Sequence, residues 1–594
     1  MAGGGFVSAF RSLGEFLQML ESMGELRRVR VPVDPKLELT EICTRALREG
    51  MPALLFENVK GSAFPLAANV YASERRVELA LGRHPAEIGT EVIRFAEELI
   101  PPSAKRVLSN RRSFFRLLSA RPRMSARGVA QEVHSTCSLD DLPVQTCWPK
   151  DGGRFITLGQ VVTYDPLNGS RNMGIYRMQV YDGKRTGMHW QIQKGGGFHF
   201  HRAEASGKDL EVAVALGTDP ATLLASVAAL PEGIDEALFA GFLRGRGVAF
   251  ARGVSVGIPV PAGAEFVLEG VVKKDERKRE GPFGDHFGHY SHAAPFPVFH
   301  LRAITHRRGA VYPATVVGIP PMEDKFLGDA TQEILGPLAR LLHHEVRDLW
   351  AYYEAGFHNL LVVSVEERYH KEAMKAALGL LGTGQLSLTK CIILVSETVN
   401  PRNWNEVLTE IREHFDPHFD FVLLPKVPLD TLDFTSFTME LGSKMILDAT
   451  RKRRPPHKSV RAVNEQRVKE MDRRILEAKV MDDTMLLVKV RGKGREVVQK
   501  LLKKKDWGAI RILAAVSEDV DLRDRENTLW GVFTRFDCER DVLFSEQRMI
   551  GIAPVYQGTM GIDATWKRGY PEPLKMDRRV VRLVDRRWKE YWKS

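Results

Sequence analysis

Cysteine is scarce in this chain of 594 residues: there are five, scattered along the sequence, and no two form a CxxC pair. An odd, scattered set in a long chain argues against a disulfide framework and predicts reduced thiols in a cytoplasmic protein. Long apolar runs are also missing, because no stretch approaches the ~18 uninterrupted apolar residues of a transmembrane helix. The Gly-rich start, Met1 to Phe10, lacks a charged segment followed by an apolar run, so we expect no signal peptide.

Neither sign of charge dominates the composition. The 86 Lys and Arg residues outnumber the 75 Asp and Glu residues, which gives a net charge of +11. This excess favours acidic substrates, cofactor phosphates or anionic lipid surfaces. Basic residues are interleaved with acids, so we expect no nucleic-acid partner. The run from Arg451 to Lys458 is most simply a solvated linker, with a phosphate or membrane-surface contact as the alternative.

Helical and strand-like patterns predict a multidomain α/β fold. Residues 1–120 alternate helices and strands and form a predicted N-terminal α/β domain. Residues 121–315 consist of short β-rich runs separated by Gly and Pro, which predicts a β-barrel or curled sheet. Residues 316–460 alternate again and form a predicted C-terminal α/β domain, and residues 461–594 form a further α/β extension.

The last two domains share a sequence pattern. Residues 393–397 (ILVSE) precede a predicted helix, and the unit ends at residues 447–452 (LDATRK). Residues 514–518 (AAVSE) and 562–567 (IDATWK) repeat this order. The pattern predicts an internal duplication of roughly sixty to one hundred residues. The alternative is a chance similarity of two βα units.

The segment Glu280-Gly-Pro-Phe-Gly-Asp285 places two acids five positions apart. Proline and glycine exclude a regular helix here, so a shaped loop is expected to hold both carboxylates. Two carboxylates ordered at one place suit proton transfer. The alternative is a surface turn with solvated acids.

Polar residues are dense between Arg171 and Gly197. Arg177 can form a planar fork to a carboxylate, and Asn172 with a distant Glu suits a hard cation. An odd spacing separates these two residues, so a regular strand would place them on opposite faces. A bulge at Gly174, or a strand that begins after Asn172, would resolve this.

The glycines that follow allow two interpretations. Lys194 and the amides of Gly195 to Gly197 could hold a phosphate, or the glycines could form a flexible turn. We expect the flexible turn from local sequence alone, and we expect His199 and His201 on an exposed strand face.

Taken together, these motifs resemble the UbiD-like decarboxylases, which use prenylated FMN. The resemblance covers most of the chain up to about residue 450, and the second copy of the terminal unit extends beyond the shorter members. Residues 320–325 (PPMEDK) and the overall length are most similar to the long members assigned to menaquinone biosynthesis. The matching segments, in order, are Asn172 to Arg177, Trp190, Lys194 to Gly196, Pro231 to Gly233 with Glu236, Glu280 to Asp285, and Thr389-Lys390.

The resemblance implies a central FMN-binding split β-barrel and a C-terminal α/β oligomerisation domain with a duplicated unit. Asn172 and Glu236 match the ligands of a divalent metal, usually manganese, and a potassium site is implied near Ala225, Ser226 and Glu236. Lys194 stands where some members have a His ligand, so it could neutralise the cofactor phosphate directly. The residues that match contacts to prenylated FMN are Asn172, Ile175, Tyr176, Arg177, His189, Trp190, Gln191, Lys194, Gly195 and Lys390.

The same resemblance implies a reversible, non-oxidative decarboxylation of an aromatic or α,β-unsaturated acid, in quinone biosynthesis or aromatic acid metabolism. Loss of CO2 from an sp2 carbon needs an electron sink, which cofactors supply and side chains do not. Arg177, Glu280 and Asp285 match the catalytic triad, with Asp285 as the proton donor, directly or through Glu280. We expect desolvation to raise the pKa of this acid towards neutrality. The rival hypothesis is an ordinary FMN-dependent reductase or oxidase on a split barrel.

The implied partners are a small aryl or unsaturated acid as substrate and a flavin prenyltransferase as the source of the cofactor. A homodimer or a homohexamer is implied for the assembly. Peripheral membrane contact stays open for a lipophilic substrate, because it requires no spanning segment.

Overall fold

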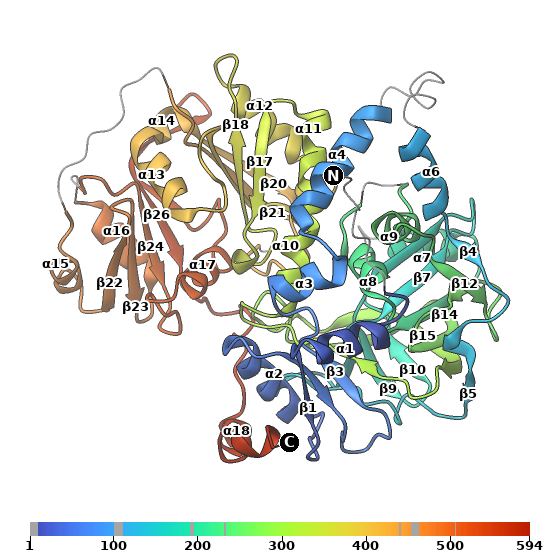
Figure 1. The fold of residues 1–594 in the computed structure, drawn as a ribbon. Helices are drawn as coiled ribbons and strands as arrows, with labels where there is room; N and C mark the ends of the chain where they lie inside the picture. The colour runs from blue at the N-terminus through green and yellow to red at the C-terminus, as the bar shows by residue number, and fades with distance from the viewer. Residues whose placement is uncertain are drawn as a thin grey trace. The chain divides into compact units, whose positions relative to one another are not determined.

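The computed structural model describes residues 10–99, 111–190, 195–230, 233–436, 438, 441–452, 462–504 and 507–593. The chain forms two compact units, drawn in Figure 1, which are described separately. The first contains Met1–Leu335 and Glu572–Ser594, and the second contains Gly336–Pro571. The division into four predicted domains stays a prediction.

The first unit begins with a small α/β layer around the four-stranded sheet β1-β2-β3-β16. Ser12 caps the first helix by accepting the amide of Glu15, and the apolar face of this helix is buried, as its spacing predicts. The elements of this layer are α1 (Leu13–Ser22), β1 (Leu26–Val29), α2 (Glu38–Arg48), β2 (Ala53–Phe56), β3 (Leu66–Ala68), α3 (Glu74–Leu81), α4 (Pro85–Leu99) and β16 (Tyr312–Pro313).

The centre of the first unit is a nine-stranded sheet in the order β6-β9-β10-β15-β14-β11-β7-β8, with β5 paired to β15. Strands β9 and β10 form an antiparallel hairpin that turns at Gly183 and Lys184. The sheet is open between β6 and β8 in the described residues, and the split barrel stays a prediction. The strands are β5 (Val133–Ser135), β6 (Arg154–Ile156), β7 (Gln160–Tyr164), β8 (Arg171–Ile175), β9 (Met178–Asp182), β10 (Arg185–Gly187), β11 (Leu210–Leu216), β14 (Phe266–Glu280) and β15 (Ala294–His306).

Further elements of the first unit surround this sheet, and a small sheet pairs β13, β12 and β4. They are α6 (Arg111–Ala120), β4 (Arg123–Met124), η1 (Val129–Gln131), α7 (Gly195–Ala205), α8 (Pro220–Val227), α9 (Glu236–Arg244), β12 (Ala249–Arg252), β13 (Pro259–Pro261), α10 (Glu323–Leu335) and α18 (Arg578–Tyr591). The last of these follows the second unit in sequence but packs in the first unit, against α2.

The second unit contains two five-stranded sheets, β17-β18-β19-β21-β20 and β22-β23-β24-β26-β25. The first is built from β17 (Val346–Ala351), β18 (Leu360–Val365), β19 (Cys391–Ser396), β20 (Phe421–Pro428) and β21 (Leu441–Asp448). The second is built from β22 (Ile475–Met481), β23 (Met485–Val490), β24 (Ile512–Val516), β25 (Val542–Ile550) and β26 (Ala553–Ala564). The helices are η2 (Gly336–Leu338), α11 (Ala339–Leu342), η3 (Tyr353–Ala355), α12 (Glu372–Leu380), η4 (Gly384–Leu388), α13 (Trp404–His414), α14 (Pro417–Asp420), α15 (Glu465–Glu470), α16 (Gly494–Leu502) and α17 (Arg525–Phe533).

The two sheets have corresponding strand orders and pairing directions. In both, the inner pairs are parallel and the outer pairs are antiparallel. Loop hydrogen bonds correspond as well: the Arg451 amide donates to Ser396 Oγ at 2.9 Å, and the Trp566 amide donates to Ser517 Oγ at 2.7 Å. These four residues lie at matching positions of the repeated sequence pattern.

Two further predictions from the sequence concern chemistry and the membrane. All five cysteines are free thiols, and four of them are buried. In the described part of the chain, no helix combines the length and the apolar composition needed to cross a membrane.

Candidate active site

The two acids predicted to act together lie on the loop between the two longest strands of the central sheet. Glu280 ends β14, and β15 begins at Ala294. Gly281 has a φ of +90°, a conformation that residues with a side chain rarely adopt, so the turn after Glu280 requires glycine. Further along, the Gly152 amide donates to the carbonyl of Pro282 at 2.8 Å. The loop is therefore shaped, as its composition predicts.

The structure accounts for the odd spacing between Asn172 and Arg177 in neither of the two ways that we expected. Asn172 lies within β8 and pairs with Thr163. The pairing of β8 with β7 is regular, so there is no bulge at Gly174. Arg177 instead lies in the two-residue break between β8 and β9. Because Arg177 lies in a break between two strands, the alternation of side chains between the two faces of a strand does not apply to it.

The guanidinium of Arg177 reaches both acids of the loop. Its Nε lies 3.0 Å from Glu280 Oε1, and its Nη1 forms an ion pair with Asp285. Nη2 donates to Ser291 Oγ at 3.2 Å, and the guanidinium carbon lies 4.9 Å from the centre of the Phe283 ring. The three charged side chains are at most 9% exposed. One buried cation thus serves two buried carboxylates.

The pKa values of the two acids move opposite to our expectation. Burial alone would raise the pKa of Asp285, but Arg177 and His286 outweigh burial and hold this pKa well below its usual range. Burial would likewise raise the pKa of Glu280, and Arg177 and His189 lower it instead. The predicted rise towards neutrality is therefore wrong for the protein without substrate, because the expectation counted burial and left out the arginine.

His189 supports Glu280 from the other side. Its Nδ1 lies 3.0 Å from Glu280 Oε1, and its ring centre lies 4.2 Å from that of Phe296. Burial is the largest influence on its pKa, which is lowered, so the imidazole is neutral at physiological pH. A neutral His189 can donate Nδ1–H to Glu280 without adding charge.

Several predicted cofactor contacts gather beside this triad. Tyr176 Oη accepts the amide of Gly196 at 3.2 Å and lies 3.5 Å from Asn172 Nδ2. A Cβ on Gly196 would lie 2.7 Å from Trp190 Nε1, and a Cβ on Gly195 would overlap the Asn172 side chain. Glycine is therefore required at both positions by close approach of side chains from β8 and from the segment after β10.

The glycine segment forms a helix, not the flexible turn that we expected. Gly195 to Gly197 make the first turn of α7, and His199 and His201 lie on the same helix instead of on a strand. His199 is buried, and its Nδ1 lies 2.9 Å from Thr163 Oγ1. Packing against the sheet overrides the weak helix propensity of three successive glycines.

The two predicted metal ligands come from neighbouring elements. Glu236 is the first residue of α9, and its carboxylate accepts the Met173 amide at 3.1 Å, next to Asn172. Burial, the largest influence, raises the pKa of Glu236 to about 7. No group of three or more His, Cys, Asp or Glu side chains in the described residues is arranged to hold a metal. Near the implied potassium site, the Ser226 hydroxyl donates to the carbonyl of Thr222 at 2.9 Å.

Three of the predicted cofactor contacts stay predictions. Gln191 and Lys194 lie outside the described residues. Lys390 belongs to the second unit, where it is fully buried and its ammonium lies 2.9 Å from Asp433 Oδ2 and 3.0 Å from the carbonyl of Phe536. The charge of Lys390 is therefore neutralised within its own unit.

Sequence reasoning missed several residues that hold the site. Asp151 accepts the Gly284 amide at 2.8 Å and so fixes the loop from a turn 133 residues earlier. His286 places Nδ1 2.8 Å from Asp285 Oδ1. Ser291 binds Arg177 directly. The His next to Asp285 was visible in the sequence, whereas nothing local indicates the long-range contact of Asp151.

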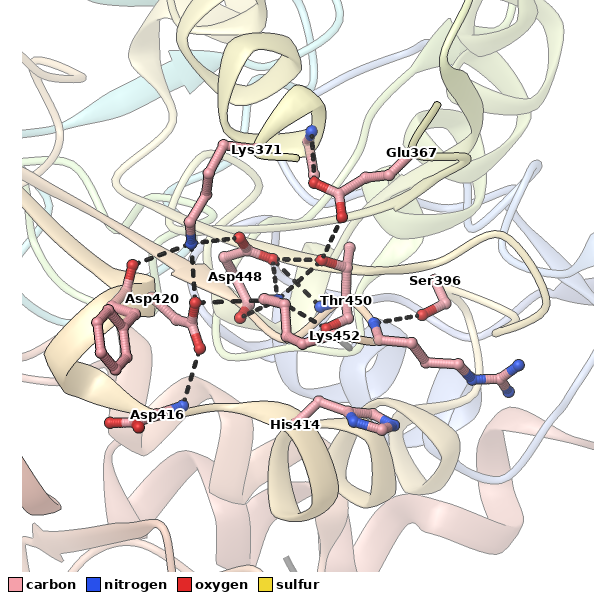
Figure 2. Close-up of polar contacts among 12 residues, drawn as sticks. Glu367, Lys371, Ser396, His414, Asp416, Asp420, Asp448, Thr450 and Lys452 are labelled. Carbon is pink, nitrogen blue, oxygen red and sulfur yellow. Dashed lines mark hydrogen bonds and ion pairs between the residues drawn. The ribbon is translucent and has the colours of Figure 1, made fainter. Parts of the chain in front are cut away.

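A second buried charge cluster lies in the second unit and is drawn in Figure 2. The Lys371 ammonium lies 2.8 Å from Asp420 Oδ1 and 2.9 Å from Asp448 Oδ2. Lys452 lies 2.7 Å from Asp448 Oδ1 and also donates to Thr450 Oγ1 at 2.9 Å. Two cations face two fully buried carboxylates here, so the cluster is balanced and its contacts are those of a structural ion network.

Comparison with known proteins identifies the family to which the chain belongs. Three family models match it: the N-terminal domain of 3-octaprenyl-4-hydroxybenzoate carboxy-lyase (UbiD) over residues 17–96, its Rift-related domain over residues 123–320, and its C-terminal domain over residues 325–449 and 476–564. A protein of Chlamydia pneumoniae, named as a subunit of 4-hydroxybenzoate decarboxylase, is 35% identical over 592 residues, which cover 98% of each chain.

Two solved structures are similar as well. The vanillic acid decarboxylase of Sedimentibacter hydroxybenzoicus, in its closed form, is 26% identical with a TM-score of 0.67, over 78% of this chain and 99% of that one. An evolved dimeric form of the UbiD-class enzyme HmfF from Pelotomaculum thermopropionicum, in complex with prenylated FMN, is 28% identical with a TM-score of 0.63, over 75% of this chain and 95% of that one.

The chain belongs to the UbiD family, and it has the multidomain α/β fold of that family. It is a carboxy-lyase of the UbiD class, whose members are decarboxylases of aromatic acids that depend on prenylated FMN. The family resemblance predicted from the motifs is confirmed.

Proposed function

We propose that Arg177, Glu280 and Asp285 carry out the reversible, non-oxidative decarboxylation of an aromatic acid beside a bound prenylated FMN. The observation that carries this proposal is the placement of one buried guanidinium between two buried carboxylates. A surface turn with solvated acids would not desolvate three charges together. The ordinary flavin reductase has no need of these acids.

The residues beside the triad suit a flavin cofactor. Among the residues that the structure describes, the indole Nε1 of Trp190 and Oε2 of Glu280 are buried and find no hydrogen-bond partner, which is costly unless a bound group forms the missing bonds. The residues that would hold the cofactor in the described structure are Asn172, Ile175, Tyr176, Arg177, His189, Trp190 and Gly195. When bound, prenylated FMN supplies the electron sink that an aryl carbanion needs.

Arg177 binds the substrate carboxylate through its planar fork. The incoming carboxylate shares this cation with Asp285, so the arginine stabilises the ionised form of Asp285 less. Burial then becomes the larger influence on the pKa of Asp285, which rises so that the acid can take up a proton. Asp285 delivers that proton to the former carboxyl carbon, with Glu280 as the neighbouring relay.

Asn172 and Glu236 would hold a divalent cation, with manganese as the proposed ion. Their amide and carboxylate oxygens suit a hard cation, and the pKa of Glu236 is raised because its carboxylate is buried. The same proposal includes a potassium ion near Ala225, Ser226 and Glu236.

The substrate is an aryl acid from quinone biosynthesis or aromatic acid metabolism, and the enzyme acts as a homo-oligomer. The family description, which names a prenylated hydroxybenzoate, supports the pathway. The second sheet of the second unit arose by internal duplication of the first. Corresponding strand orders and loop hydrogen bonds support this origin.

Expression with and without a flavin prenyltransferase tests the function. We expect CO2 release from hydroxylated benzoates or naphthoates, measured by mass spectrometry, only from protein that contains the prenylated cofactor. In D2O, deuterium should enter the ring at the former carboxyl carbon. Equal turnover with ordinary FMN, or no turnover across the panel, would overturn the proposal.

A further inference from the structure

The loop between β14 and β15, which follows Glu280 and contains Asp285, is called here the acid loop. The segment that returns from the second unit to the first lies along this loop. Residues 572–574, called here the return segment, directly follow the last residue of the second unit. The segment is joined to the loop by backbone pairing, as in an added antiparallel strand. The contacts are Tyr290 N to Glu572 O at 3.2 Å, Leu574 N to Gly288 O at 2.9 Å, and a bridge between His289 and Pro573.

Leu574 fills the space behind the loop. Its side chain is 5% exposed. A Cβ on Gly284 would lie 2.9 Å from Leu574 Cδ2 and would overlap the Trp148 ring, so Gly284 is held between these two side chains. Gly284 immediately precedes Asp285. A change in the volume of Leu574 therefore acts one residue away from the proposed proton donor.

Helix α18, which follows the return segment, is anchored in the first unit. Val584 and Tyr591 are fully buried, and Tyr591 Oη donates to Glu38 Oε1 at 2.7 Å. On the same helix, Asp585 lies 2.6 Å from Arg45 Nη1. These contacts are made to α2, not to the acid loop. The contacts of α18 therefore fix the helix itself, whereas the pairing of residues 572–574 holds the loop.

We propose that the return segment is a positioning element of the active site, with Leu574 as its positioning residue. Its backbone pairs with residues 288–290 of the acid loop. Leu574 and Trp148 hold Gly284 between them, and this packing fixes the position in which Asp285 contacts Arg177. The return segment directly follows the second unit in the chain, and hydrogen bonds join it to the loop that contains Asp285. The inference rests on the proposed function of Asp285 for its effect on catalysis, but not for its effect on the loop.

Leu574→Ala tests the proposal in the full chain with prenylated FMN bound. We expect kcat to fall at least ~10-fold with KM changed less than about threefold, because a displaced catalytic group slows the chemical step. Hydrogen exchange of the amides in residues 283–291 should speed up. Leu574→Met, which keeps the volume, should restore both readouts to near the wild-type values.

Val584→Ala is the matched control, because it removes a buried side chain from the same C-terminal segment without touching the loop. We expect faster exchange in α18 but unchanged exchange in residues 283–291 and unchanged kcat. Equal behaviour of the Leu574 and Val584 variants would overturn the proposal. If Leu574→Ala does not fold, Leu574→Val gives the same comparison. If the wild type shows no turnover but Leu574→Ala still speeds up exchange in residues 283–291, the proposed function would be wrong and the positioning role of the return segment would stand.

Discussion

At the scale of single residues, the electrostatics of the site depend on one cation that forms ion pairs with two acids. Arg177 lowers the pKa of both Glu280 and Asp285 against the effect of burial. His189 adds a neutral donor to Glu280. The resting site therefore holds ionised acids, and the proposed mechanism requires another anion to compete for the arginine before Asp285 can take up a proton. Our expectation considered desolvation alone, which would raise the pKa of these acids and therefore does not explain why they are ionised in the resting site.

Asp285→Asn tests the role of the proton donor. Asparagine keeps the size of the side chain but cannot deliver a proton, so kcat should fall at least ~100-fold, the contribution typical of general acid catalysis. The bound flavin spectrum should stay unchanged. CO2 release under saturating substrate measures the effect. A variant that turns over within threefold of the wild type would remove Asp285 from this role.

Lys444 gives a prediction about pH. Its ammonium is buried and donates to the carbonyls of Ser387 and Thr389 at 2.8 and 2.7 Å. Burial is the largest influence and lowers its pKa from 10.5 to about 8. Between these two values the unfolded chain binds more protons than the folded chain, so the contribution of Lys444 to stability rises with pH and is constant below about pH 8.

Urea unfolding of the wild type and Lys444→Met from pH 7.5 to 10.5 measures this contribution. The free energy of unfolding of the wild type, relative to the variant, should rise by up to ~3 kcal/mol over that range. Because both proteins contain the same other titrating groups, their difference isolates Lys444. Curves that stay parallel across the range would contradict the lowered pKa.

At the scale of elements, sequence patterns predicted an alternation of strands and helices over residues 316–460. That alternation is present, for example in β18, β19 and α13, and α13 is the helix predicted after residues 393–397. The helix α7 was missed because its first turn is three glycines. The rings of Trp190 and Phe200, 5.2 Å apart, pack this helix in the core. Such tertiary packing cannot be derived from local propensity.

The two sheets of the second unit with their helices, called here the first and the second copy for the sequence pattern that they share, also differ in a way that local patterns do not predict. In the first copy, Lys371 and Lys452 both contact Asp448 (Figure 2). In the second copy, Asp563 lies 3.6 Å from the partly exposed Lys567. Gly494 lies so close to Asp563 that a Cβ there would overlap its carboxylate. The same Asp-x-Thr turn is therefore held by two cations in one copy and by one in the other.

Asp448→Asn and Asp563→Asn form a matched pair. Asp448→Asn removes one of two carboxylates that balance two cations, so it should destabilise the protein by roughly 3–5 kcal/mol. Asp563→Asn should cost less, because Asp563 faces one lysine instead of two and that lysine is farther away. Denaturant unfolding of both variants measures the difference. An equal loss in the two copies would show that the additional lysine contributes nothing to stability.

At the scale of the whole molecule, the motifs brought Arg177, Glu280 and Asp285 together correctly in space across more than a hundred residues. That juxtaposition came from the family resemblance, since no local pattern encodes it. The sequence did not indicate that residues after Pro571 return to the first unit. Contacts such as Leu574 with the acid loop depend on the path of the complete chain, which periodicity does not determine.

The two copies in the second unit are joined by side chains of each copy that donate to backbone carbonyls of the other. The bonds are Asn359 Nδ2 to Phe533 O at 3.0 Å, Lys390 Nζ to Phe536 O at 3.0 Å, Thr484 Oγ1 to Leu408 O at 2.9 Å, and Arg511 Nε to Arg412 O at 3.1 Å. Each copy donates to the other. Separation of the copies would leave buried donors and carbonyls without partners, so we expect the copies to unfold together.

Leu513→Ala, in β24 of the second copy, tests this coupling. Leu513 is fully buried, so the truncation should destabilise its sheet by roughly 2–5 kcal/mol. If the copies unfold as one, amide exchange in β19 of the first copy should accelerate to the same degree as in β24. Leu54→Ala, an equally buried change in the first unit, is the control and should leave exchange in β19 unchanged. Accelerated exchange confined to the second copy would mean that each sheet is stable alone, and that the reciprocal hydrogen bonds do not make the second unit a single cooperative structure.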